Sequence, residues 1–192
     1  MKKGLLLLLA STVLAVSCIG CDKKNTVSGG ESVQETTVNY KENLNGNTYN
    51  GTNYKITVND KWTILEENTG GECAFTYNDE ELGETDVPTS IGVSVQDFPQ
   101  DTTFDDLINQ TRSGYESVKE VTIESQSFVK VCGIDGVELK LKIVGGDVDV
   151  VLDQRFVEKD GKLFMLNITY MPDRYEQVKD EIDAVLSTFE IL

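Results

Sequence analysis

The stretch that decides the fold is VDVVLDQRFVEKDGKLFMLNITY, residues 148–170. Two runs rich in apolar residues, 148–159 and 162–170, flank Asp160-Gly161, a dipeptide typical of a tight hairpin turn. Residues 163–166 are all apolar, so both faces of the second strand must be covered. The stretch therefore predicts an antiparallel hairpin inside a sheet that is packed on both sides.

Apolar residues alternate with polar ones in several other short runs, and this period predicts strands. The runs are 54–58, 72–78, 91–96 and 137–144. Residues 121–131 are expected to form a further strand, and Asp135-Gly136 predicts a hairpin turn between it and the run 137–144. The run 137–144 alternates so regularly that one of its faces is expected to meet solvent.

Two stretches change to helical periodicity. In the first, Thr103 with Asp106 predicts an N-cap, and in the second Asp173 with Glu176 predicts a capping box after Pro172. The apolar faces are Phe104, Leu107, Ile108, Thr111 and Tyr115 in the first helix, and Tyr175, Val178, Ile182, Val185 and Leu186 in the second. The last residues, FEIL, predict a short final strand. The expected fold class is α+β, with a mainly antiparallel sheet between helices.

Three features together resemble the PsbP-like family, which includes the extrinsic photosystem II subunit, a Ran-release factor and many bacterial lipoproteins. They are Lys61-Trp62 after the first strand, the strand DGVELKLKI (135–143), and the C-terminal hairpin and helix (156–192) with Ser187-Thr188-Phe189 near its end. The resemblance covers residues 52–192 and implies an α/β/α sandwich without a common catalytic motif. Because members of the family bind different partners, the fold does not settle the function.

The N-terminus is similar to a bacterial lipoprotein signal. Met1-Lys2-Lys3 is positive, and the apolar run 5–16 is shorter than the ~20 residues of a membrane-spanning helix. Cys18 and Cys21 follow this run. Cys21 is favoured as the lipidated residue, because Gly20 precedes it and polar residues begin directly after it. Cys18 is the alternative, and a redox-active C-x-x-C pair is disfavoured because no folded strand–helix context surrounds it.

The sequence divides into three parts on this interpretation. Residues 1–20 are a lipoprotein signal peptide, 21–50 a flexible spacer and 51–192 a PsbP-like domain. The spacer is rich in Asn, Thr, Ser, Gly, Glu and Lys and has no apolar period, so it cannot offset its own ordering entropy. The expected location is the extracytoplasmic face of a bacterial cell membrane, where two acyl chains hold the protein.

The composition limits the partners. Asp and Glu number 33 against 17 Lys and Arg, which gives a net charge of −16. This balance argues against nucleic acid and against docking on anionic lipid by charge. Histidine is absent, so the commonest general base and metal ligand are missing. No cofactor and no catalytic residues are predicted.

Cys73 and Cys132 are the remaining cysteines, and two interpretations stay open for them. An exported domain permits a disulfide between them, whereas two separate buried thiols would simply fill space. The acidic runs 78–86 and 147–153 lack the spacing of a calcium loop, so no metal site is predicted. Trp62 is expected to pack at the edge of the sheet.

These features favour a non-enzymatic binding or scaffold module of the cell envelope. Its membrane contact would be the covalent lipid, and its partner an envelope protein or a small ligand. The alternatives are a carrier of an apolar ligand and an envelope enzyme that uses carboxylates of the two acidic runs. Two carboxyl groups that converge in a deep cleft, with the pKa of one of them raised, would favour the enzyme. A dry apolar cavity would favour the carrier, and a fully packed domain with one exposed apolar patch would favour the binding module.

Overall fold

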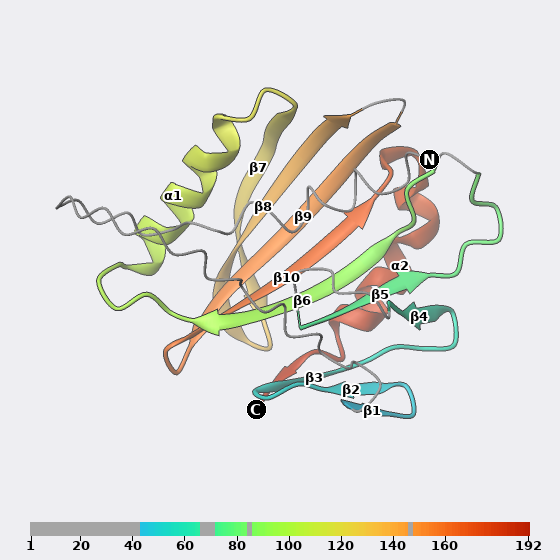
Figure 1. The fold of residues 1–192 in the computed structure, drawn as a ribbon, viewed down its shortest axis with the longest axis horizontal. Coiled ribbons are helices and arrows are strands. Elements are labelled where there is room, and N and C mark those ends of the chain that lie inside the picture. The colour runs from blue at the N-terminus through green and yellow to red at the C-terminus, as the bar shows by residue number, and fades with distance from the viewer. Residues whose placement is uncertain (1–42, 66–71, 84–85, 146–147) are drawn as a thin grey trace, which may run out of the picture.

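The computed structural model describes residues 43–65, 72–83, 86–145 and 148–192. In these residues a seven-stranded sheet lies between α1 on one face and α2 with a small second sheet on the other (Figure 1). The strand order is β4-β5-β6-β10-β9-β8-β7, and all neighbours are antiparallel. The strands are β4 (Trp62–Ile64), β5 (Cys73–Tyr77), β6 (Ser90–Asp97), β7 (Val121–Val131), β8 (Ile134–Gly145), β9 (Val148–Lys159) and β10 (Lys162–Tyr170). The α+β fold class predicted from the sequence is confirmed.

The small sheet joins the two ends of the described chain. Its order is β1-β2-β3-β11. The strands are β1 (Leu44–Asn45), β2 (Thr48–Asn50), β3 (Tyr54–Thr57) and β11 (Glu190–Ile191). The predicted C-terminal strand is therefore present. The folded part begins earlier than the predicted limit between residues 50 and 51, because β1 and β2 are paired and Tyr49 is only 1% exposed.

The predicted burial of β10 on both faces is confirmed. Leu163 and Met165 belong to a cluster that α1 covers, whereas Phe164, Leu166 and Ile168 belong to the cluster under α2 and the small sheet. Successive residues of a strand point to opposite faces, so one strand supplies both cores. β8, which β9 separates from β10, shows the predicted wet face: Val137, Leu139 and Leu141 are buried, and the lysines and glutamate that alternate with them are partly exposed.

The two helices differ in how they begin. α1 (Phe104–Glu116) has the predicted cap, because the Thr103 hydroxyl accepts a hydrogen bond from the Asp106 backbone N–H at 3.1 Å. The capping box predicted for the second helix is absent. Pro172–Arg174 instead form a 3₁₀ turn, in which the Arg174 N–H donates to the Met171 carbonyl at 3.0 Å. α2 (Tyr175–Leu186) follows this turn without a side-chain cap.

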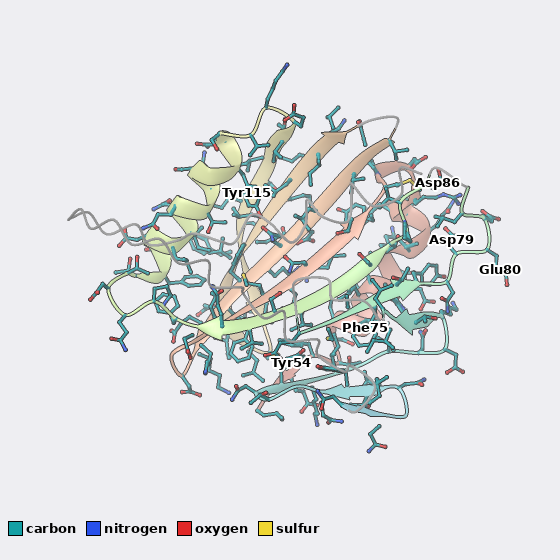
Figure 2. The ribbon with its side chains drawn as sticks, in the orientation of Figure 1. Tyr54, Phe75, Asp79, Glu80, Asp86 and Tyr115 are labelled. Carbon is teal, nitrogen blue, oxygen red and sulfur yellow. The ribbon has the colours of Figure 1, made fainter. Side chains whose placement is uncertain are left out.

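A buried polar contact fixes α1 to the sheet. The hydroxyl of Tyr115, labelled in Figure 2, donates to Gln154 Oε1, and Gln154 Nε2 donates to Asn167 Oδ1 at 2.6 Å. Gln154 is 1% exposed, so these partners replace water for its amide.

The two hairpin predictions have opposite outcomes. The turn between β9 and β10 is at Asp160-Gly161, with φ of 53° and 72°. The turn between β7 and β8 is not at Asp135-Gly136 but at Cys132-Gly133, with φ of 52° and 79°. Gly136 lies inside β8, where a Cβ atom would overlap the carbonyl oxygen of Phe156. Its lack of a side chain therefore serves close approach of two strands and not a turn.

Among the described residues, no helix is long and apolar enough to cross a membrane.

Candidate functional site: the edge strand β7

β7 is the outer strand of the large sheet, and its only partner there is β8. No other described strand lies along its outer side. Most of its eleven residues are exposed, and Phe128 is 89% exposed, the largest fraction among the bulky apolar side chains that the structure describes. A long exposed edge with an aromatic side chain is a template for pairing with another strand.

The turn that follows β7 fixes which backbone groups point outward. Val131 and Ile134 flank the two-residue loop Cys132-Gly133 and form the first pair of the ladder. In a two-residue hairpin this first pair exchanges both hydrogen bonds, and alternate pairs do the same. The inward-bonded residues of β7 are therefore Val131, Val129, Ser127 and Ser125, and the backbone N–H and C=O of Lys130, Phe128 and Gln126 point away from the sheet.

α1 covers only the first half of β7. Val121 and Ile123 pack against the cluster under α1, but Phe128 does not belong to that cluster. The register shifts between Ile123 and Ser125, which marks Glu124 as a bulged residue. The regular, uncovered part of the edge is therefore residues 125–131, which we call the open edge.

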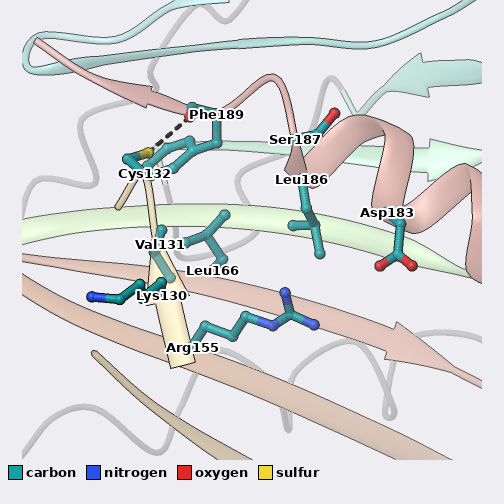
Figure 3. Close-up of a pocket in the computed structure, with 9 residues that line it drawn as sticks. All are labelled: Lys130, Val131, Cys132, Arg155, Leu166, Asp183, Leu186, Ser187 and Phe189. Atoms are coloured by element: carbon teal, nitrogen blue, oxygen red, sulfur yellow. Dashed lines mark hydrogen bonds between the residues drawn. The ribbon is translucent and has the colours of Figure 1, made fainter. Parts of the chain in front are cut away.

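A pocket of about 280 Å³ lies at the end of this edge (Figure 3). Lys130, Val131 and Cys132 form one wall, and Leu186 and Phe189 lie across from them. The Cys132 thiol donates to the Phe189 carbonyl at 2.8 Å, which ties the β7–β8 turn to the segment after α2.

Arg155 also lines the pocket, but two carboxylates already bind its guanidinium. Its Nη2 lies 3.3 Å from Asp153 Oδ2, and its Nε lies 3.5 Å from Glu138 Oε1. Burial raises the pKa of Asp153 and nearby Glu138 raises it further, while Arg155 opposes the rise. Two carboxyl groups thus converge, and the pKa of one of them is raised, as the enzyme alternative requires, but both are paired with Arg155, whose single positive charge offsets one of the two negative charges.

The acidic run 78–86 is held by hydrogen bonds and one arginine. Arg174 donates to the Glu81 carbonyl at 2.9 Å and lies 3.2 Å from its carboxylate, and the Gly83 N–H donates to Asp86 Oδ2 at 2.7 Å. Figure 2 shows Asp79, Glu80 and Asp86 around this loop, far from Tyr115. No group of three or more potential metal ligands occurs in the described residues.

The second acidic run is also paired. Asp149 lies 2.7 Å from Lys142, its diagonal neighbour on β8, and Asp153 binds Arg155 as described above. Residue 147 lies outside the described residues.

Both cysteines of the domain are free thiols in the structure, so the disulfide that export would permit is not formed there. Cys73 is buried on β5 with the Tyr54 hydroxyl 3.3 Å from its sulfur, and burial raises the pKa of its thiol to about 12. Cys132 is exposed and bonds to Phe189. Cys18 and Cys21 lie outside the described residues.

Trp62 occupies the place expected from the sequence. It lies on β4, the other edge strand, is 5% exposed, and meets the Tyr77 ring edge-on at 5.3 Å between centroids. It is a packing residue of the sheet edge.

Phe128 is not among the functional residues predicted from the sequence. One signal was available, because the run SQSFVKV places an aromatic residue among polar ones in a strand with no clean alternation. This signal indicates an exposed binding residue only when β7 is known to be the outer strand, and the order of strands is a property of the whole fold.

No family model and no curated protein matches the sequence. Solved structures do match. CyanoP, the PsbP protein of Synechocystis sp. PCC 6803, has a TM-score of 0.54 at 19% identity, covering 76% of this chain and 91% of CyanoP. LpqN of Mycobacterium tuberculosis has a TM-score of 0.55 at 14% identity, covering 72% and 82%. Protein PA94 of Pseudomonas aeruginosa has a TM-score of 0.51 at 15% identity, covering 73% and 93%.

Identities this low speak for the fold alone. The chain has the PsbP-like fold, as the resemblance of its sequence implies.

Proposed function

We propose that the chain is a lipid-anchored, non-enzymatic binding module of the bacterial cell envelope, which binds a protein partner at the open edge of β7. The observation that carries this proposal is the 89% exposed ring of Phe128 on a strand whose outward backbone groups face no other strand of the described residues. A partner strand would satisfy those groups and cover the ring in one step.

The energetic gain from such pairing is substantial. Burying a phenylalanine side chain contributes about 2 kcal/mol, and each backbone hydrogen bond adds about 1 kcal/mol net. Natural proteins protect exposed edges with proline, charge or bulges. In this strand the bulge lies at Glu124, which is itself charged, and the other charge lies at Lys130, so the residues between them are left open.

The lipoprotein signal supports a place in the envelope. Lipid on Cys21, or on Cys18 as the alternative, would hold an acidic domain at a membrane that its charge does not favour. LpqN, which shares the fold, is a protein involved in cell envelope biogenesis, and this agrees with the proposed location.

Charge pairing weighs against the enzyme alternative. A general acid or base needs a carboxyl group that can exchange its proton with a substrate. Asp153 and Glu138 instead share Arg155, and Asp149 pairs with Lys142. This pairing is the structural reason for preferring a binding role.

Site-specific photo-crosslinking in living cells tests the proposal. A benzophenone amino acid at position 128 is expected to form protein adducts in the membrane fraction. The same group at Thr63, an exposed residue of the opposite edge strand β4, is the matched control. Equal yields at both positions, or none at position 128, would contradict binding at the open edge.

Mass spectrometry of the mature N-terminus tests the anchor. A diacylglycerol-modified peptide that begins at Cys21 is expected, and one that begins at Cys18 would select the alternative. An unmodified N-terminus would contradict the lipid anchor.

A further inference from the structure

We propose that the open edge of β7 pairs with the open edge of a second copy, antiparallel, about a two-fold axis at Phe128. This inference rests on the proposed role of that edge as the binding surface and names its partner. The result is one continuous sheet across two molecules.

The hydrogen-bond pattern defines the register. In an antiparallel pair, outward-pointing residues of one strand meet outward-pointing residues of the other. An axis at Phe128 pairs Phe128 with its own copy, and Gln126 with Lys130 of the second copy on each side. Each such pair exchanges two N–H···O=C bonds, so the ladder contains about six.

The bulge at Glu124 favours a two-fold axis at Phe128 over one at Ser127. An axis at Ser127 would require the Glu124 backbone to lie in register opposite Lys130 of the second copy. Glu124 is the bulged residue, so its backbone groups leave the regular ladder. An axis at Phe128 uses only the regular residues 125–131.

Charge explains why two acidic molecules meet at this strand. The open edge contains no carboxylate, although the chain carries 33 acidic residues. Its one charge, Lys130, would lie opposite the neutral Gln126 of the second copy, with Glu124 of that copy next along the strand. Like charges directly opposite one another destabilise a sheet, and this register has none.

The two-fold symmetry also explains why an aromatic side chain is exposed at the centre of the open edge. The two Phe128 rings lie directly opposite one another on the same face of the joined sheet, where cross-strand aromatic pairs contribute to stability. Each ring, 89% exposed in the single chain, is covered by its equivalent. No further protein is needed to cover it.

Disulfide crosslinking in native membranes tests the register. The full-length chain carries Phe128→Cys with Cys132→Ser, which removes the other exposed thiol of the domain. A pair that exchanges both bonds has Cα atoms about 5.5 Å apart, within the range of a disulfide. Mild oxidation is expected to give a reducible band at twice the monomer mass.

Thr122→Cys in the same background is the matched control, because Thr122 is exposed and lies on the same strand. In the proposed register the two copies of residue 122 are about 40 Å apart, so no dimer band is expected. Equal dimer yields from both variants would overturn the register.

A second pair of variants separates loss of binding from loss of folding. Phe128→Lys is expected to weaken self-association at least tenfold in sedimentation experiments on the detergent-dispersed chain. Val144→Lys, which changes another exposed apolar residue, is expected to leave it unchanged. Unchanged association of Phe128→Lys would overturn the inference.

The outcome also separates this inference from the proposed function. If Phe128→Cys forms adducts but none at twice the monomer mass, the second copy is excluded as the partner, while the open edge is still supported as a binding surface. If it forms no adduct at all, the second copy is excluded, and the photo-crosslinking experiment at position 128 decides the proposed function independently.

Discussion

Phe128 is the residue on which the proposed binding surface depends most. A single exposed apolar residue is ordinary on a protein surface. Phe128 differs because its own backbone N–H and C=O also point outward, so one partner strand would satisfy both the ring and the backbone. The chemistry of the site is therefore that of strand addition.

At the residue scale, the two thiols of the domain are expected to react differently. Burial raises the pKa of both thiols, that of Cys73 to about 12, but Cys132 is exposed whereas Cys73 is buried. Only the thiolate reacts, so maleimide at pH 7.5 is expected to label Cys132 in the native protein and Cys73 only after unfolding. Peptide mass spectrometry identifies the labelled sites. Resistance of Cys132 to labelling until a reductant is added would show that it is oxidised in the native protein.

Asp153 is expected to make the free energy of unfolding depend on pH. Its folded-state pKa is raised, so the folded state holds its proton more tightly than the unfolded state does. Between the unfolded pKa of about 3.9 and the higher folded pKa, this carboxyl group lowers stability as pH rises. Asp153→Asn removes that contribution. The stability of the variant relative to the natural chain should therefore rise over that pH window, as measured by urea unfolding at a series of pH values.

A constant difference between the two proteins across pH 3 to 8 would contradict a raised pKa. An Asp153 whose ion pair with Arg155 outweighed burial would give the opposite sign, because the variant would then lose stability relative to the natural chain as pH rises.

At the element scale, the β7–β8 hairpin shows what a local pattern cannot reveal. Asp135-Gly136 and Asp160-Gly161 have the same two residues, yet only the second is a turn. Gly136 lies inside β8, where the Phe156 carbonyl on β9 approaches so closely that a side chain would not fit. That contact exists only after the strands assemble, so the dipeptide alone predicts a turn in both places.

Most elements were predictable because their periods are local. The longer strands, the N-cap of α1 and the doubly buried β10 follow from residues next to one another in the sequence, whereas the short strands β1, β2 and β4 were not predicted. The open edge was not predictable from the sequence. Its prediction requires knowing that β7 pairs with only one described strand and that α1 does not extend over Phe128 on the face of the sheet. Strand order and layer coverage are long-range properties.

Two glycine substitutions test this reading of the hairpin. Gly136→Ala is expected to lower the free energy of unfolding by about 2 kcal/mol or more, because the added methyl group meets fixed backbone. Gly114→Ala is the matched control: nothing lies within 4 Å of its added carbon, and alanine in a helix should stabilise by about 0.5–1 kcal/mol. Chemical denaturation measures both. Equal effects of the two substitutions would contradict the close approach of β8 to β9.

At the scale of the whole molecule, net charge opposes self-association. Each chain carries −16, so two copies repel one another overall, although the open edge itself contains no carboxylate. A lipid anchor would offset this repulsion by confining the copies to one surface and raising their effective concentration.

Salt is therefore expected to strengthen the proposed dimer. Raising the ionic strength from about 0.05 M to 0.5 M shortens the Debye length and screens the repulsion. The dissociation constant of the detergent-dispersed chain should fall in sedimentation equilibrium, whereas Phe128→Lys should stay monomeric throughout. A dissociation constant that rises with salt would show that attraction between opposite charges, and not strand pairing, holds the copies together.

The central claim is that the outward side of β7 is covered when the protein is at work, and amide hydrogen exchange tests it most directly. Exchange is compared between intact membranes and the dilute, detergent-dispersed chain, with residue resolution along β7. The amides of Gln126, Phe128 and Lys130 should exchange at least tenfold more slowly in membranes, while those of Ser127 and Val129, bonded to β8, should be protected in both states. Fast exchange of the three outward amides in membranes would contradict the claim.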